Sequence, residues 1–207
     1  MLTIYGRTNS VNVQKVLWCL AELAVPYTRV DAGLTHGKNT EAWYLALNPN
    51  GKVPLLQDGE FTLWESNTIV RYLAGKHGAG SLCPTSLEAR ALAERWMDWQ
   101  LSTLLRPVSI VFQNLFRVPR HERDGGAIEA NLREANRAMA MLDTHLTERP
   151  YVAGVAFTMG DIPVGAVAHR WLEIPGIERP PLAAVRAWRA RLADRPGFRT
   201  HVQLPLS

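Results

Sequence analysis

The chain has 207 residues, of which 47% are hydrophobic and 20% charged, so it can form one large domain or two small ones. This apolar content excludes a disordered chain, and two cysteines far apart in sequence, Cys19 and Cys83, favour neither a zinc motif nor a disulfide scaffold. The net charge is only +4, and the basic residues are dispersed among acids, which argues against nucleic-acid binding.

The first residues, MLTIYGRTNS, lead directly into a strand-like run without the charged and apolar regions of a signal peptide. No window approaches the ~20 apolar residues of a membrane span. We therefore expect a cytoplasmic protein without a metal, a membrane association or a nucleic-acid partner.

The first 78 residues alternate between strand and helix patterns. Residues 2–6 predict a strand, 13–23 an amphipathic helix and 27–31 a second strand, an order that implies two parallel strands joined by a crossover helix. The further predicted elements are a helix at 41–47, a hairpin of strands at 53–57 and 61–64, and a helix at 66–77.

A Gly/Pro/Ser-rich segment follows, and beyond it the pattern is helical. The predicted helices are 88–105, 127–146, 159–172 and 182–194. Thr158 and Asp161 have the three-residue spacing of a capping box, which predicts that they fix the start of a buried helix.

The loop between the first strand and the first helix, Arg7 to Asn12, is rich in short polar side chains. Free N–H groups at a helix start attract an anion, and Thr8, Ser10 and Asn12 can donate further hydrogen bonds. The same residue types are common N-caps, so a purely structural role is the alternative.

Two later segments offer further binding groups. Pro54 stands at the start of a strand, either as an edge residue or as a cis proline that turns the Val53 backbone outward to pair with an extended peptide. Glu65 can bind an ammonium group, and Ser66 with the helix start behind it can bind a carboxylate. In the alternative interpretation Ser66 is a cap and Glu65 is solvated.

The ordered segments TNSVNVQKVLWCLAEL, NPNGKVPLL, LWESNTIVRYLA and FTMGDI resemble a cytosolic glutathione transferase, of the bacterial type with a Ser/Thr-x-Asn loop. The resemblance covers nearly the whole chain. It implies an α/β thioredoxin-like N-terminal domain at 1–78, a linker at 79–86 and an all-α C-terminal helical-bundle domain at 87–207. It also implies glutathione as co-substrate, transfer to a small electrophile by addition or halide displacement, a role in detoxification, and a homodimer.

The resemblance assigns roles to single residues. Ser10 matches the hydroxyl that hydrogen-bonds the glutathione sulfur, and Asn12 the amide that assists or replaces it. Val53, before the presumed cis Pro54, matches the residue that pairs with the cysteinyl unit. The other matched glutathione-binding positions are Glu65 and Ser66 for the γ-glutamyl group, Lys52 for the glycine carboxylate, and His36 and Lys38, which lie in a loop that sometimes shares that task.

The first loop contains no cysteine, unlike that of thiol-transferase members, and Cys19 falls within the first helix, where we expect a packed thiol. The reactive sulfur then belongs to the substrate. A free thiol has a pKa of ~8.5, and lowering it by ~2 units requires ~2.7 kcal/mol. One or two hydrogen bonds to the thiolate, together with a helix N-terminus, supply this free energy.

The electrophile is expected near Arg7 and residues 100–117, where Gln113 and Arg117 can polarise a leaving group and Arg117 can face an acidic substrate such as a halogenated acid. The candidate apolar wall consists of Trp96, Trp99, Phe112 and Phe116. Two alternatives remain: a glutathione-dependent disulfide reductase, and a non-catalytic glutathione-transferase-like binding protein.

Overall fold

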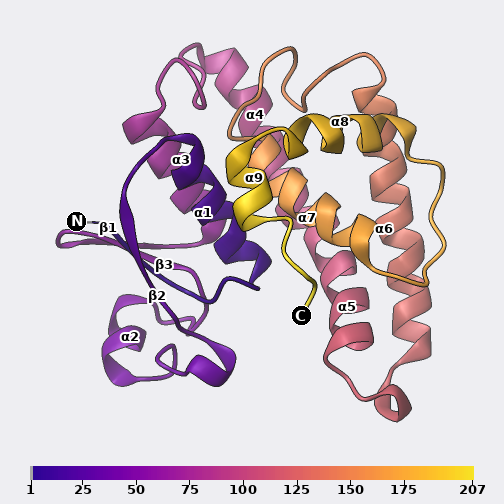
Figure 1. Ribbon diagram of the computed structural model, residues 1–207, viewed down its shortest axis with the longest axis horizontal. Coiled ribbons are helices and arrows are strands. Elements are labelled where there is room, and N and C mark those ends of the chain that lie inside the picture. Colours follow the sequence, from indigo (N-terminus) through magenta and orange to yellow (C-terminus); the bar gives the residue numbers. More distant parts are fainter. Residues whose placement is uncertain (1) are drawn as a thin grey trace.

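The computed structural model describes residues 2–207. The N-terminal half contains β1 (Leu2–Tyr5), α1 (Val11–Glu22), β2 (Tyr27–Val30), α2 (Ala42–Leu47), β3 (Leu55–Asp58), β4 (Phe61–Trp64) and α3 (Ser66–His77). The C-terminal half contains α4 (Leu87–Trp99), α5 (Leu105–Phe116), α6 (Gly125–Leu146), α7 (Asp161–Glu173), α8 (Ala183–Ala193) and α9 (Pro196–His201). Figure 1 shows the sheet and its helices on one side of the molecule and the helical half on the other.

The sheet has the strand order β2-β1-β3-β4, with β1 parallel to β2 and antiparallel to β3, and with β3 and β4 forming the predicted hairpin. Successive side chains point to opposite faces. Ile4 and Leu56 therefore join the core with α1 and α3, whereas Leu55 packs with Tyr44 of α2 on the other face (Figure 1). The first half has the predicted thioredoxin-like architecture.

The sheet register positions the candidate site. Tyr5, the last residue of β1, lies opposite Leu55, the first residue of β3. The loop that follows β1 and the Val53–Pro54 peptide that precedes β3 therefore lie at the same end of the sheet.

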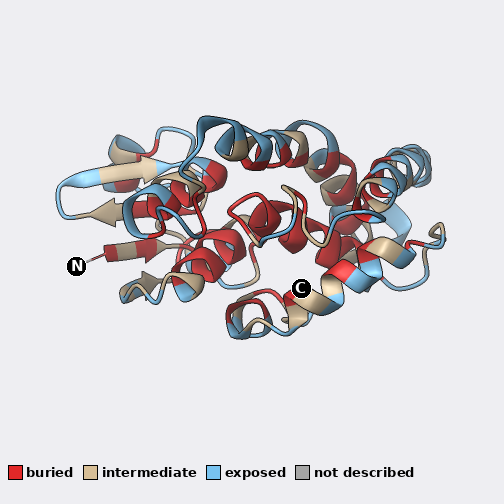
Figure 2. Cartoon of the chain, turned by 90° about the horizontal axis from the view of Figure 1, so that it is seen from above, coloured by how far each residue is buried: buried red, intermediate tan, exposed pale blue. Residues whose placement is uncertain are grey.

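Helix α7 runs through the centre of the molecule and is buried over nearly its whole length (Figure 2). Gly165 allows its close approach to neighbouring elements, because a Cβ atom there would lie 2.8 Å from Leu192 Cδ1 and 3.1 Å from the Trp18 ring. Trp18 of α1 also packs against Phe198 of α9, with ring centroids 4.9 Å apart. α7 and α9 thus join the helical half to the first helix of the sheet domain.

The predicted capping box at the start of α7 is present in a modified form. The Asp161 carboxylate accepts a hydrogen bond from the Thr158 backbone N–H at 3.0 Å, which is the expected reciprocal bond. The Thr158 hydroxyl accepts from the Gly160 N–H at 3.3 Å. Asp161 also accepts from Val152 N and Trp188 Nε1, so it ties three separate segments together.

The helix predicted at 88–105 is instead two helices joined by a π-helical turn, Gln100–Leu104, and it continues to Phe116. Pro107 explains the interruption, because proline lacks an N–H and its ring clashes with the carbonyl four residues earlier. The short α9, which begins with Pro196, was also not predicted.

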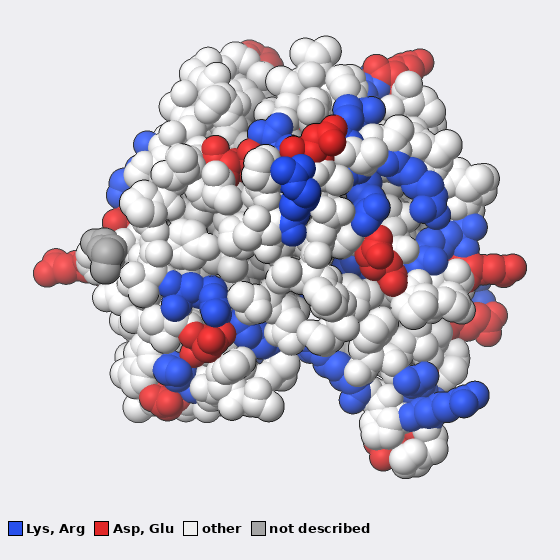
Figure 3. All heavy atoms as spheres, viewed as in Figure 1, with Lys and Arg blue, Asp and Glu red and all other residues white. Residues whose placement is uncertain are grey.

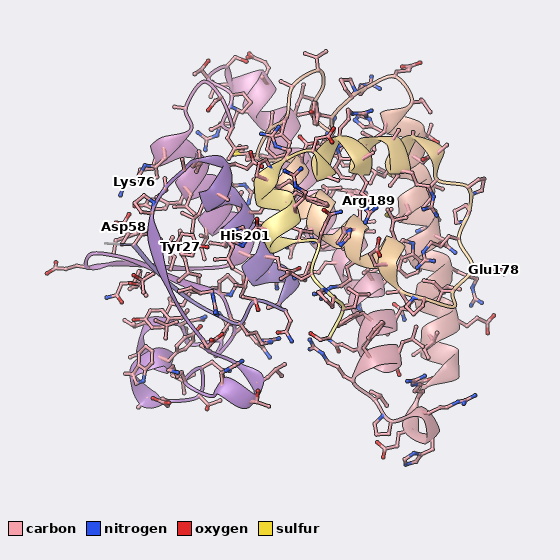
Figure 4. The ribbon with its side chains drawn as sticks, in the orientation of Figure 1. Tyr27, Asp58, Lys76, Glu178, Arg189 and His201 are labelled. Carbon is pink, nitrogen blue, oxygen red and sulfur yellow. The ribbon has the colours of Figure 1, made fainter. Side chains whose placement is uncertain are left out.

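Side-chain interactions link neighbouring elements as well. Asp58 at the end of β3 forms an ion pair with Lys76 of α3 (Figure 4). Asp58 also accepts a hydrogen bond from the Tyr72 hydroxyl at 2.8 Å. Between the two halves, Arg195 forms an ion pair with Glu22 at 2.6 Å. No helix within residues 2–207 is long and apolar enough to cross a membrane.

Candidate active site

The start of α1 lies beside the first loop. Ser10 occupies the N-cap position, is buried, and has extended backbone angles, but its hydroxyl makes no hydrogen bond to the first turn of the helix. The Asn12 Oδ1 atom is also buried without a protein partner among the described residues. The Gln14 side chain donates to the Thr8 carbonyl at 3.1 Å and holds the loop. Within the described residues, neither the Ser10 hydroxyl as a helix cap nor the Asn12 carboxamide oxygen has a protein hydrogen-bond partner.

The Val53–Pro54 peptide bond is cis, as one of the two sequence interpretations required. The main-chain N–H and C=O of Val53 form no hydrogen bond with residues 2–207. The preceding Lys52 carbonyl is held by the Tyr44 hydroxyl at 2.6 Å and by Asn48 Nδ2 at 2.8 Å. The structure thus fixes the chain just before Val53 and leaves the Val53 main chain unpaired within residues 2–207.

The start of α3 carries the third predicted binding segment, Glu65 and Ser66. Glu65 is exposed and has a φ of 70°, a left-handed conformation that is strained for a residue with a side chain. Ser66, the first residue of α3, is buried.

Lys15, which the sequence pattern did not single out, lies beneath this helix start. Its ammonium is completely buried and lies 3.5 Å from Ser66 Oγ, 3.2 Å from Asn67 Oδ1 and 3.0 Å from Gln100 Oε1. Burial lowers the pKa of Lys15 to about 7, although nearby Glu65 raises it in part. Lys15 connects α1, α3 and the π-helical turn at the base of the site.

The three remaining residues predicted to bind glutathione are Lys38, His36 and Lys52, and they lie at the periphery of the site. Lys38 donates to the Asp31 carbonyl at 3.0 Å, and His36 and Lys52 are exposed. The loop that carries His36 and Lys38 nevertheless approaches the site, because a Cβ atom on Gly33 in this loop would lie 2.8 Å from Arg7 Nη1 and 3.3 Å from Val53 Cγ1.

Three arginines lie between the first loop and the helical half. Arg170 of α7, which is 8% exposed, donates to the Asn9 carbonyl at 3.1 Å. Its guanidinium carbon is 4.4 Å from the centre of the Phe112 ring, and that of Arg117 is 5.3 Å from the same ring. Burial lowers the pKa values of Arg7 and Arg170, and the positive charge of Arg117 lowers both further.

Two of the predicted aromatic wall residues lie elsewhere. Trp96 and Trp99 pack against each other and line a pocket of about 530 Å³ together with Met141 and His145. Phe112 and Phe116 stack on each other beside the arginines, with centroids 4.8 Å apart. Gln113 is exposed one turn before Arg117.

Cys19 is the packed thiol that the sequence predicted. It is completely buried, its Sγ lies 3.9 Å from the Val70 carbonyl, and burial raises the pKa of the thiol. A neutral, inaccessible thiol is a poor nucleophile. Within residues 2–207, no group of three or more His, Cys, Asp or Glu side chains is arranged to hold a metal ion.

A thioredoxin-like domain whose cis proline faces the start of α1, followed by a helical domain, defines the glutathione transferase class of folds. The family model for the glutathione S-transferase N-terminal domain matches residues 1–75, and that for the C-terminal domain matches residues 108–196. The chain therefore belongs to the glutathione S-transferase family.

Full-length relatives agree with this assignment. Glutathione S-transferase GstB of Escherichia coli K12 is 41% identical over 100% of both chains, and glutathione S-transferase 3 of Zea mays is 32% identical over 99% of this chain and 95% of its own. The theta class glutathione S-transferase of Xanthomonas axonopodis pv. citri, solved with glutathione bound, has a TM-score of 0.96 and 46% identity, covering 100% of this chain and 99% of its own. The protein is a glutathione transferase.

Proposed function

We propose that Ser10 and Asn12 activate glutathione as its thiolate at the start of α1 for attack on a small electrophile, by addition or by halide displacement. The observation that carries this proposal is the Ser10 hydroxyl, which is buried at the N-cap but makes no cap hydrogen bond. A hydroxyl at this position can donate to a sulfur anion, and the helix N-terminus adds favourable electrostatics. No general base is required.

The rest of glutathione would bind along the two other loops. The unpaired Val53 main chain, before Pro54, suits the cysteinyl unit as an added strand. Glu65 and Ser66 would hold the γ-glutamyl group, and exposed Lys52 the glycine carboxylate. Lys38 and His36 are available from the neighbouring loop.

The domain division follows the change in element type. We assign glutathione binding to residues 1–78, the linker to 79–86 and the electrophile pocket to 87–207, with Arg7, Gln113 and Arg117 contributing to the pocket. The family resemblance favours a cytoplasmic location.

Replacing Ser10 by alanine should raise the pKa of the bound glutathione thiol by about one unit and lower kcat/KM near neutral pH about ten-fold, because one hydrogen bond to the thiolate is lost. We expect a similar loss for Asn12→Ala. Thiolate absorbance in a pH titration and turnover with a halide, an epoxide and a disulfide measure both effects.

Thr85→Ala is the control, because Thr85 is an exposed threonine of the linker, outside the proposed glutathione site. Turnover that survives the combined Ser10→Ala and Asn12→Ala change would refute this activation mechanism. Failure of the parent protein to bind glutathione would refute the binding site as a whole, and turnover confined to the disulfide would favour the reductase alternative.

We propose a homodimer as the working assembly. Exposed apolar side chains on β4, α4, the π-helical turn and α6 support it; they are Trp64, Leu92, Leu101 and Met141.

Met141→Glu should convert the dimer to a monomer in light scattering, because it places a charge in this apolar surface. Val155→Glu, which alters an exposed apolar residue elsewhere, should leave the dimer intact. A monomeric parent protein, or a dimer insensitive to Met141→Glu, would contradict this assignment.

A further inference from the structure

Three cations meet where the first loop touches the helical half, and none forms an ion pair with an acid within residues 2–207. Arg7 comes from the first loop, Arg117 from the end of α5 and Arg170 from α7. The ion pairs of the described residues do not include any of the three. In Figure 3, Lys and Arg atoms line the hollow between α2 and the lower end of α5.

The hydrogen-bonding capacity of this arginine cluster is incompletely used. The Nε atoms of Arg7 and Arg170 are buried and have no hydrogen-bond partner among the described residues. Arg170 is 8% exposed, and its one hydrogen bond goes to the Asn9 carbonyl. A buried cation without an anion is costly, and like charges add repulsion. A bound anion would remove both penalties.

The position of the cluster identifies which ligand would bring that anion. Asn9, whose carbonyl binds Arg170, directly precedes Ser10, and Arg7 lies beside Gly33 and close to Val53. The cluster therefore faces the place assigned to the glutathione sulfur. The stacked Phe112 and Phe116 rings provide an apolar surface next to it.

We propose that the electrophile carries a carboxylate next to its reacting carbon, and that Arg7, Arg117 and Arg170 bind this carboxylate. This inference rests on the proposed function. Planar guanidinium groups bind carboxylates with paired hydrogen bonds, which would orient the reacting carbon toward the sulfur. A haloacid is the simplest molecule of this class.

The reaction with a haloacid balances without any redox partner. The glutathione thiol gives its proton to solvent when the thiolate forms. The sulfur electron pair forms the new C–S bond, and the C–Cl electron pair leaves with chloride. The carboxylate does not change, so the product is a glutathione thioether that retains the anionic group.

Chloroacetate and chloroacetamide form a matched pair for the test, because they differ in the charged group and share the leaving group. Each enzymatic kcat/KM is divided by the uncatalysed rate constant with glutathione. We expect the parent protein to accelerate chloroacetate at least ten-fold more than chloroacetamide. Arg117→Gln should lower kcat/KM about ten-fold for the acid and less than three-fold for the amide.

Arg120→Gln is the control, because Arg120 is an exposed arginine in the short turn just after Arg117. It should leave both substrates unchanged. An equal loss on both substrates in Arg117→Gln would show that the arginines act on the thiolate alone, and the carboxylate site would be refuted. Equal acceleration of the two substrates by the parent protein would refute it as well.

Calorimetric binding of the two thioether products gives a readout independent of turnover. The parent protein should bind S-carboxymethylglutathione at least ten-fold more tightly than S-carbamoylmethylglutathione, and Arg170→Gln that retains the parent circular dichroism should reduce the difference. Equal affinities would overturn the inference. A parent protein that binds glutathione but shows no preference for the acid disproves only the carboxylate site, whereas one that does not bind glutathione disproves the proposed function.

Discussion

Asp161→Ala should destabilise the protein by about 3–5 kcal/mol, the largest loss we expect from a single side chain that contacts no substrate. The Asp161 carboxylate is completely buried and accepts from the Val152 N–H at 2.9 Å, the Trp188 Nε1–H at 3.0 Å and the Thr158 N–H at 3.0 Å. Alanine would leave these donors buried without an acceptor. In a chain of this size the melting temperature should fall by about 10 °C or more.

The control is Asp124→Ala at the start of α6. Asp124 accepts from the Ala127 N–H at 2.9 Å but is exposed, so water can replace the lost bond and we expect only about 1 kcal/mol. Urea unfolding of both variants measures the difference. Similar losses in the two variants, or intact stability with lost glutathione affinity in Asp161→Ala, would refute the structural role of Asp161.

The sequence predicted elements that depend on local patterns. The hydrophobic spacing of residues 13–23 and the hairpin around Gly59 are local, and α1, β3 and β4 appear within two residues of the predicted bounds. The π-helical turn before Pro107 was missed because the chain accommodates the proline by widening a turn, whereas the usual response is to end the helix.

The residues of the candidate site also separate into those that a local sequence motif indicates and those that only tertiary packing brings together. Ser10, Val53 and Glu65 could be proposed as site residues from the sequence because each belongs to a short motif. Lys15 and Arg170 were missed because each is a charged residue inside a buried helix, and only tertiary packing brings it to the site. The one available signal was a charge among apolar neighbours, which a solvated helix face also produces.

The buried ammonium of Lys15 should make the folded protein more stable as the pH rises from about 7 to about 10. The pKa of Lys15 is lowered from 10.5 to about 7 in the folded state, mainly by burial. In this interval the unfolded chain binds a proton that the folded chain does not, so the free energy of unfolding increases with pH. The shift sets an upper limit of about 5 kcal/mol on the gain.

Lys15→Met should remove this pH-dependent contribution and make the ligand-free protein more stable below pH 7, because it replaces an unpaired buried charge by an apolar side chain of similar length. Urea unfolding of parent and variant across this pH range measures the difference. The comparison cancels the contribution of Cys19, whose raised thiol pKa has the opposite sign because the unfolded chain loses its thiol proton first. Lys52→Met, at an exposed lysine that forms no ion pair within residues 2–207, should keep the parent slope.

The same substitution should weaken glutathione binding. Lys15 lies under Ser66 and Asn67 at the start of α3, where the γ-glutamyl carboxylate would supply its missing counter-ion. The buried Lys15 charge then lowers the free energy of unfolding of the free protein, and bound glutathione compensates for it. Such a trade-off is expected where a residue serves ligand binding at the expense of stability. Bound glutathione should also raise the pKa of Lys15, so binding near pH 8 should take up protons, which calorimetry in buffers of different ionisation enthalpy detects. An unchanged affinity and unchanged proton uptake in Lys15→Met would mean that the ammonium supports the core alone.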